Sequence, residues 1–143
     1  MRAVPAMVAP ASCILIVDDD AENREVLEIV LGWEGFVTMS AQSGREALAL
    51  AMHSVPDLVL LDIMMPGMDG YQVATALKSS AVTRHIPIMM VSALREADVR
   101  ARCLNVGAED FLTKPMDREE VVLRIRNVLH RKPQRVGEGQ GGD

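Results

Sequence analysis

Short apolar runs alternate along this chain with longer segments in which apolar residues recur every three or four positions. The apolar runs Ile14–Val17, Leu58–Leu61 and Ile88–Val91 predict buried strands, and Phe36–Ala41 and Phe111–Thr113 predict two more. Strands that are apolar throughout are typical of a parallel sheet with helices on both faces. The alternation therefore predicts an α/β fold with five strands.

The segments between the strands, and the one after the last strand, have helical periodicity. Ser43 and Glu46 predict a capping box at the start of the second helix, and Asp117 predicts a cap for the last one. Gly107 is placed to end the fourth helix. The apolar positions are Val26, Ile29, Val30 and Trp33 in the first helix, and Val121, Ile125, Val128 and Leu129, the expected core face, in the last.

The length of 143 residues is typical of one domain, which we expect to occupy residues 12–131. Residues 1–11 are apolar like a weak secretory signal, but prolines interrupt them and they run directly into the first strand, so they predict a flexible extension. Residues 132–143 are polar and rich in glycine, and they predict a disordered tail or the start of a linker.

Composition narrows the class of protein. Only 3% of residues are aromatic although 49% are hydrophobic, so aliphatic side chains and methionines must build the core. The net charge of -5 argues against direct binding of nucleic acid. Cys13 and Cys103 lack CxxC spacing and predict reduced cysteines, hence a cytoplasmic location. No apolar run approaches the roughly 20 residues of a membrane helix, so no membrane partner is expected.

Polar residues follow four of the predicted strands at their C-terminal ends. Asp18 and Asp19 follow the first strand, Asp62 the third, Ser92 the fourth and Lys114 the fifth. The C-terminal ends of parallel strands lie along one edge of the sheet, where such folds bind ligands. The sequence therefore predicts a site with three carboxylates, a hydroxyl and an ammonium group.

Three neighbouring carboxylates repel one another unless a cation joins them. Mg²⁺ fits best because it prefers oxygen ligands, with Mn²⁺ as an alternative, whereas zinc is disfavoured without histidine or cysteine. Lys114 can pair with a carboxylate or a phosphoryl oxygen, and the Ser92 hydroxyl can donate to the same group. Ala93 is small and leaves a way in. Aspartate forms acyl phosphates in phosphoryl transfer, and Asp62 is the best candidate nucleophile because it stands alone on the middle strand, flanked by the other two acids and Lys114.

The segments ILIVDDD, PDLVLLDIMMPGMDG, IPIMMVSA and GAEDFLTKP carry a resemblance that extends over residues 12–131. Their order and spacing resemble those of the receiver domain of two-component response regulators, including chemotaxis receivers. The resemblance implies a flavodoxin-like, doubly wound sheet of five parallel strands in the order 2-1-3-4-5, with five helices. It also implies a phosphoacceptor signalling switch rather than an enzyme that turns over a substrate.

The resemblance assigns roles to the site residues. Asp62 accepts a phosphoryl group from a histidine kinase or a phosphotransfer protein. Asp19, Asp62 and the backbone carbonyl of Met64 bind Mg²⁺ directly, while Asp18 helps through water. Lys114 contacts the phosphoryl group.

Further implied roles concern switching and the lifetime of the phosphoryl group. Ser92 turns toward the phosphoryl group and Phe111, which lacks the hydroxyl of the common tyrosine, swings inward with it. Pro115 follows a cis peptide bond. The family tunes phosphoryl lifetime at the positions of Met64 and Leu94; both are apolar here and cannot orient a water, so we expect slow self-dephosphorylation.

Two other functions compete with a switch. A haloacid-dehalogenase-like phosphatase would use Asp18 as nucleophile, Asp20 as acid, and Ser92 and Lys114 as phosphate contacts. That hypothesis leaves Asp62 unexplained, and it lacks both a substrate cap and an acidic pair after Lys114. A phosphorylation-independent adaptor is the third hypothesis, and the complete set of acids and Lys114 argues against it.

The expected output is contact with a downstream protein or an output domain. The last two helices are a candidate homodimer face, because Asp110, Arg124 and Arg126 resemble charges that pair across the dimer face of some DNA-binding regulators, although a solvated charged face explains the same residues. The identity of the kinase and target, and whether the chain is a single-domain regulator or the first part of a longer one, stay open.

Overall fold

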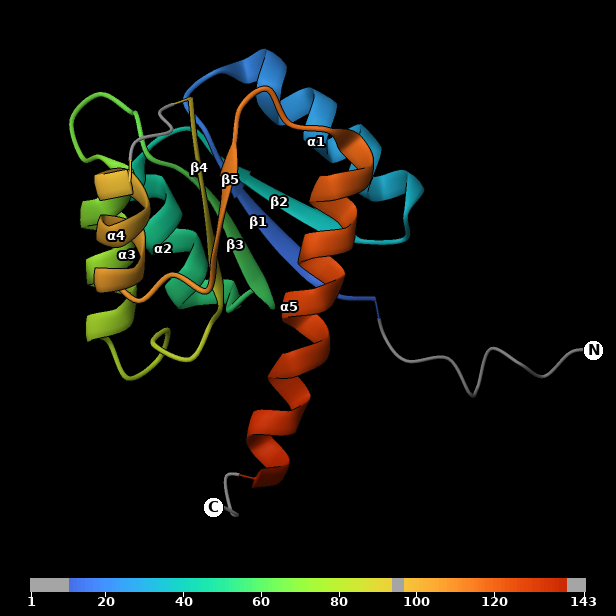
Figure 1. Cartoon of the computed structure of the whole chain (residues 1–143), viewed down its shortest axis with the longest axis vertical. Coiled ribbons are helices and arrows are strands. Elements are labelled where there is room, and N and C mark those ends of the chain that lie inside the picture. The colour runs from blue at the N-terminus through green and yellow to red at the C-terminus, as the bar shows by residue number, and fades with distance from the viewer. Residues whose placement is uncertain (1–10, 94–96, 139–143) are drawn as a thin grey trace, which may run out of the picture.

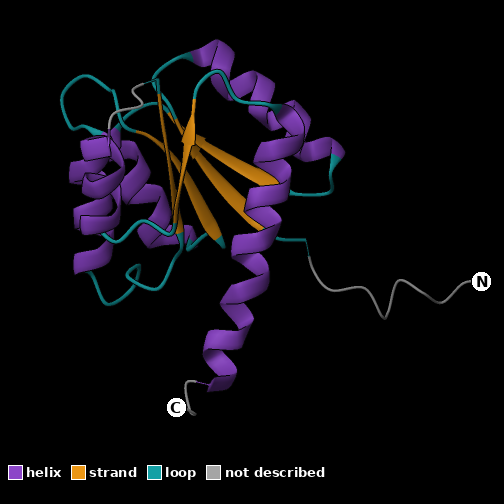
Figure 2. Ribbon diagram, viewed as in Figure 1, coloured by secondary structure: helices purple, strands orange, loops and turns teal. Residues whose placement is uncertain are grey.

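The computed structural model describes residues 11–93 and 97–138, so residues 1–10 of the predicted extension, residues 139–143 and Leu94 lie outside the described part. Within that part, five strands alternate with five helices (Figures 1 and 2). In chain order these are β1 (Cys13–Val17), α1 (Ala21–Trp33), β2 (Val37–Ala41), α2 (Gly44–Ser54), β3 (Leu58–Asp62), α3 (Gly70–Ser79), β4 (Ile88–Ser92), α4 (Ala97–Asn105), β5 (Asp110–Thr113) and α5 (Arg118–Glu138).

The strands form one parallel sheet in the order β2-β1-β3-β4-β5, which confirms the predicted fold. The register places Val17 opposite Leu61 and Asp62 opposite Val91, so β1, β3 and β4 end at nearly the same level. Chain connections leave β1 and β3 toward opposite edges of the sheet. The C-terminal ends of these two strands therefore border the crevice in which folds of this kind bind ligands.

Each face of the sheet carries its own aliphatic core. Leu15, Leu61 and Met90 point toward the layer of α2, α3 and α4, whereas their strand neighbours Ile16 and Leu60 point toward α1 and α5. All of these side chains are at most 2% exposed. Burial on both faces explains why the strands are apolar throughout, and it fixes their ends rigidly.

The predicted cap residues and the glycine after α4 are confirmed, but only half of the capping box at α2 forms, because the Glu46 side chain accepts from the Gln42 backbone N–H rather than from that of Ser43. Ser43 accepts a hydrogen bond from the backbone of Glu46, and Asp117 from that of Glu120. Gly107 follows α4 with a φ of 91°, a left-handed conformation that favours glycine. No helix of the described residues is long and apolar enough to cross a membrane.

The last helix differs from expectation in its length. Its core face is confirmed, because Val121, Ile125 and Val128 are buried and Leu129 packs partly against the same core. The backbone of α5, however, stays helical to Glu138, past the expected domain boundary at residue 131. Composition reports whether a segment can pack into a core, but it does not fix the residue at which an existing helix ends.

The residues of α1 that are buried differ from the apolar positions that define its helical periodicity in the sequence. Val30 is buried together with Leu27 and Leu31. Val26, Ile29 and Trp33 are 59%, 51% and 71% exposed. The apolar periodicity correctly predicts a helix, but three of the four apolar residues that define it, all except Val30, lie on the outer surface.

Close packing at the start of α3 leads to a test of how β3 is held. A Cβ atom on Gly70 would lie 2.5 Å from the Asp62 carbonyl oxygen and 2.6 Å from the Ile63 Cα atom. Because both atoms belong to the backbone, we expect Gly70→Ala to lower the free energy of unfolding by about 1–3 kcal/mol in urea denaturation.

Gly32→Ala is the matched control, since a Cβ atom there meets nothing within 4 Å and Gly32 lies inside α1. This variant should raise the free energy of unfolding by about 0.5–1 kcal/mol. Equal effects of the two substitutions would contradict the packing argument.

Candidate phosphoacceptor site

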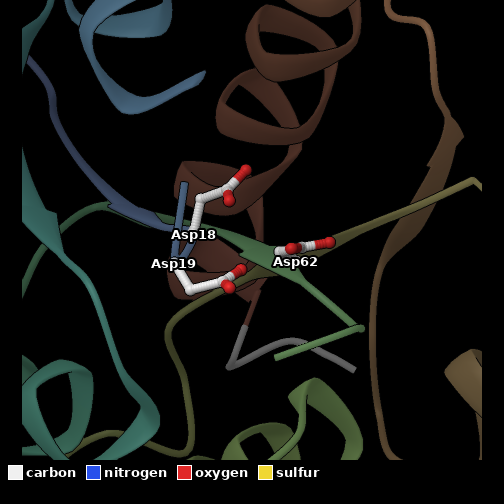
Figure 3. A group of neighbouring side chains, drawn as sticks. All are labelled: Asp18, Asp19 and Asp62. Atoms are coloured by element: carbon white, nitrogen blue, oxygen red, sulfur yellow. The ribbon is translucent and has the colours of Figure 1, made fainter. Parts of the chain in front are cut away.

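Three aspartates meet at the C-terminal edge of the sheet. Asp18 and Asp19 directly follow β1, and Asp62 is the last residue of β3. Each offers a carboxylate oxygen that lies within 4.8 Å of the other two (Figure 3). Asp18 and Asp62 are buried, whereas Asp19 is exposed at the mouth of the site. The predicted cluster therefore exists, with two of its charges largely removed from water.

The first turn of α1 holds Asp18 in place. The Asp18 carboxylate accepts hydrogen bonds from the Asp20 backbone at 2.9 Å and from the Asn23 side chain at 3.4 Å. The Arg24 side chain donates to the backbone carbonyl oxygen of Asp18 at 2.7 Å. Asp20 itself caps α1 through the Glu22 backbone. The sequence reasoning missed Asn23 and Arg24, although polar residues one helical turn after an acidic strand end were the available signal.

Lys114 provides the positive charge at the centre of the site. Its Nζ atom lies 3.5 Å from a carboxylate oxygen of Asp18 and 3.5 Å from one of Asp62. The backbone N–H of Lys114 donates to the Ser92 carbonyl at 2.8 Å, which ties the end of β5 to the end of β4. The peptide bond between Lys114 and Pro115 is cis.

Lys114 only partly balances the negative charge of the Asp62 carboxylate. Burial raises its pKa from 3.8 to about 6, with a further raising effect from Asp18 and Asp19, while Lys114 opposes the shift. One lysine therefore does not neutralise three neighbouring carboxylates.

The donor set fits Mg²⁺, because three carboxylate oxygens converge and Mg²⁺ favours oxygen ligands. The histidines do not contribute, since His53, His85 and His130 are exposed elsewhere on the surface. A divalent cation at this position would relieve the repulsion from Asp18 and Asp19, which adds to the effect of burial on the Asp62 pKa.

The remaining predicted residues surround the three acids at different depths. Ser92 is fully buried at the end of β4, and the neighbouring Ala93 is exposed. Phe111 is partly buried against the core on the α2–α4 side. The Met64 side chain is 60% exposed, while Met65 is buried.

The loop between β3 and α3 frames the site. The Gly70 N–H donates to the Ile63 carbonyl at 2.8 Å, and Asp69 and Gln72 form a reciprocal capping box at the start of α3. Gly67 has a φ of 76°, a left-handed conformation that glycine adopts without strain because it has no Cβ atom. The loop therefore holds the rim rather than supplying a further charged group.

A family model described as the response regulator receiver domain matches residues 14–126. The chain belongs to this family. Response regulator PleD of Caulobacter vibrioides is 44% identical over 119 residues, and the phosphate regulon regulatory protein PhoB of Pseudomonas aeruginosa is 42% identical over 118. These alignments cover 83% and 82% of this chain but 26% and 52% of the relatives, so the chain spans about a quarter to a half of their length.

Solved structures agree with this membership. A putative response regulator from Chloroflexus aurantiacus superposes with a TM-score of 0.80 at 35% identity, covering 84% of this chain and 98% of that one. Chemotaxis protein CheY4 of Vibrio cholerae gives 0.79 at 28% identity, with 82% and 98% covered. The chain is thus a receiver module of phosphorelay signalling. Receiver domains are a family of switches that work through phosphorylation of an aspartate.

The raised pKa of Asp62 has a consequence for stability. Because its carboxyl binds a proton more tightly in the folded state, the stability that it contributes is present below pH 3.8 and is lost as the pH rises through about 6. In protein stripped of divalent cations, Asp62→Asn should therefore raise the free energy of unfolding by about 1–3 kcal/mol at about pH 8 and change it little near pH 4. Urea denaturation in a chelator at the two pH values measures this difference.

Asp117→Asn is the control, because Asp117 is exposed and asparagine caps a helix equally well. Its effect should be small and similar at both pH values. A loss of stability in Asp62→Asn at the higher pH would show that the ion pair with Lys114 outweighs the cost of burial.

Proposed function

We propose that Asp62 is the phosphoacceptor of this receiver module and that its donor is a phosphohistidine on a histidine kinase or a phosphotransfer protein. The observation that supports this proposal is the position of Asp62, which is buried at the end of a central strand close to both Asp18 and Lys114. Asp18 is held by α1 and Asp19 is exposed, so they suit the role of cation ligands better than that of nucleophile.

The chemistry follows from these positions. A carboxylate oxygen of Asp62 forms a bond to phosphorus while the bond between phosphorus and the donor's histidine nitrogen breaks, giving an acyl phosphate. Lys114 moves from its carboxylate partners to a phosphoryl oxygen, which replaces one charged contact by another. Bound Mg²⁺, held by Asp19, Asp62 and the Met64 carbonyl with Asp18 acting through water, would neutralise charge on the phosphoryl oxygens.

Phosphorylation then acts on the end of β4 and on β5. The Ser92 hydroxyl turns toward the phosphoryl group, Phe111 moves inward, and α4 and β5 shift as a result. Ala93 is small and exposed, which leaves the phosphoryl group accessible. The output is contact with a downstream protein or an output domain, through a population shift between two conformations.

The charges on α5 bear on a secondary proposal, a homodimer through α4 and α5. Arg124 lies 2.8 Å from Asp110 and 3.1 Å from Glu120, and Arg126 lies 2.9 Å from Glu34, all within one chain. Dimerisation would need some of these pairs to form across the interface instead.

We also propose a cytoplasmic location for the protein. It is supported by Cys13 and Cys103, which are both free thiols.

Labelling with a small phosphodonor and Mg²⁺ tests the assignment. Wild-type protein should take up one phosphoryl group per chain, and Asp62→Asn should take up none at that position, as intact-mass measurement reports. Lys114→Ala should slow labelling by at least roughly tenfold, because a charge-assisted contact in the transition state is lost.

The matched control is Asp117→Asn, which leaves the site intact and should be labelled normally. Repeated hydrolysis of the donor that Asp18→Asn abolishes would favour the phosphatase instead. The structure already weakens that alternative, because Asp20, its required acid, caps α1 through the Glu22 backbone. Binding of a downstream partner that is indifferent to Asp62→Asn would favour an adaptor.

The lifetime of the phosphoryl group is a separate expectation. The exposed Met64 thioether accepts hydrogen bonds only weakly, so it cannot orient a water for attack on phosphorus. We expect a half-life far longer than seconds in purified phosphorylated protein. Met64→Asn should shorten it by roughly tenfold by positioning that water, and an unchanged half-life would remove Met64 from this role.

A further inference from the structure

Two donors share one oxygen of the buried Asp18 carboxylate. The Asn23 side chain donates to Asp18 Oδ2 at 3.4 Å, and the Nζ atom of Lys114 lies 3.5 Å from the same oxygen. Neither contact is short, whereas Oδ1 accepts from the Asp20 backbone at 2.9 Å. Asp18 is 4% exposed, so water supplies little of the hydrogen bonding that its carboxylate needs.

The two donors differ in what phosphorylation requires of them. Lys114 also lies 3.5 Å from Asp62, the neighbour of Asp18 in Figure 3, and in the proposed function it moves to a phosphoryl oxygen. Its departure would leave Asp18 Oδ2 buried without a donor if Asn23 were absent. An unpaired buried acceptor costs more free energy than an ordinary hydrogen bond gains.

Asn23 is placed to stay with Asp18 while the lysine moves. It lies in the first turn of α1, which Arg24 ties to the Asp18 carbonyl oxygen at 2.7 Å. Asn23 and Lys114 also line one cavity of about 480 Å³ between α1 and the connection from β5 to α5, so Lys114 has space in which to move.

We propose that Asn23 is a positioning residue for phosphoryl transfer to Asp62, because its amide keeps Asp18 Oδ2 hydrogen-bonded when Lys114 leaves. Asparagine is neutral, so it supports the carboxylate without adding a second cation that would compete with Lys114 for the phosphoryl group. This role rests on the proposed function of Asp62 and Lys114, and it concerns a side chain that does not itself touch the phosphoryl group.

A double-mutant cycle tests this role. Asn23→Leu keeps the size of the side chain and removes its N–H donors, so labelling by a small phosphodonor at saturating Mg²⁺ should slow by about three- to tenfold. In a Lys114→Ala background the same substitution should change the rate by less than about twofold, since no lysine then has to leave Asp18. Asn23→Gln retains the amide and should recover part of the rate.

The side-chain amide of Asn23 also gives a signal that needs neither turnover nor metal. Its NH₂ resonances in the NMR spectrum are those that Asn23→Leu removes. In protein stripped of divalent cations, Lys114→Ala should move them downfield, because the hydrogen bond to Asp18 Oδ2 shortens when it is no longer shared. Beryllofluoride with Mg²⁺, a mimic of the phosphoryl group, should move them in the same direction in the wild-type protein.

Asn127→Leu is the matched control, because it makes the same exchange at an exposed position inside α5. It should be labelled at the wild-type rate. Urea denaturation of Asn23→Leu shows whether the variant is folded under the conditions of labelling. The NMR resonances decide the question if Lys114→Ala is labelled too slowly for the rates to be compared.

Equal slowing by Asn23→Leu in both backgrounds, or Asn23 resonances that Lys114→Ala does not move, would overturn the proposal. It would also fail if Asn23→Leu slows transfer from a phosphohistidine protein but not from the small donor, since Asn23 would then act in docking of the donor protein. If Lys114→Ala moves the resonances but wild-type Asp62 is never labelled, the failure is that of the proposed function alone.

Discussion

The contact of one lysine with two buried carboxylates is the interaction on which the site depends. Lys114 lies 3.5 Å from both Asp18 and Asp62, and yet burial still raises the Asp62 pKa to about 6. The folded protein thus maintains an excess of negative charge that one lysine does not balance. An arrangement of this kind favours a divalent cation.

Rigid packing elsewhere makes this unfavourable arrangement tolerable. The central strands are buried on both faces by aliphatic side chains, so their ends are fixed and the acids cannot move apart. Gly70 approaches the backbone of Asp62 and Ile63 and holds the end of β3 from the other side. The two hydrophobic cores and the close backbone contact therefore offset the free-energy cost of placing these charges close together.

Helix α1 connects the site to the outer surface. Its first turn holds Asp18 through Asn23 and Arg24, its inner face joins the core, and its outer face exposes Ile29 and Trp33. The cavity beside Lys114 uses the boundary between these faces.

The pattern of apolar and polar residues is enough to predict the strands, the helices and the edge of the sheet that carries the site. Burial on two faces requires continuous apolar strands, and parallel strands bring Asp18, Asp62, Ser92 and Lys114 to one edge. Contacts in the folded protein set which apolar stripe of α1 is buried and which acids lose contact with water. Those outcomes depend on contacts between residues far apart in the chain, such as the 92 residues that separate Arg126 from Glu34. Local periodicity carries no information about such distances.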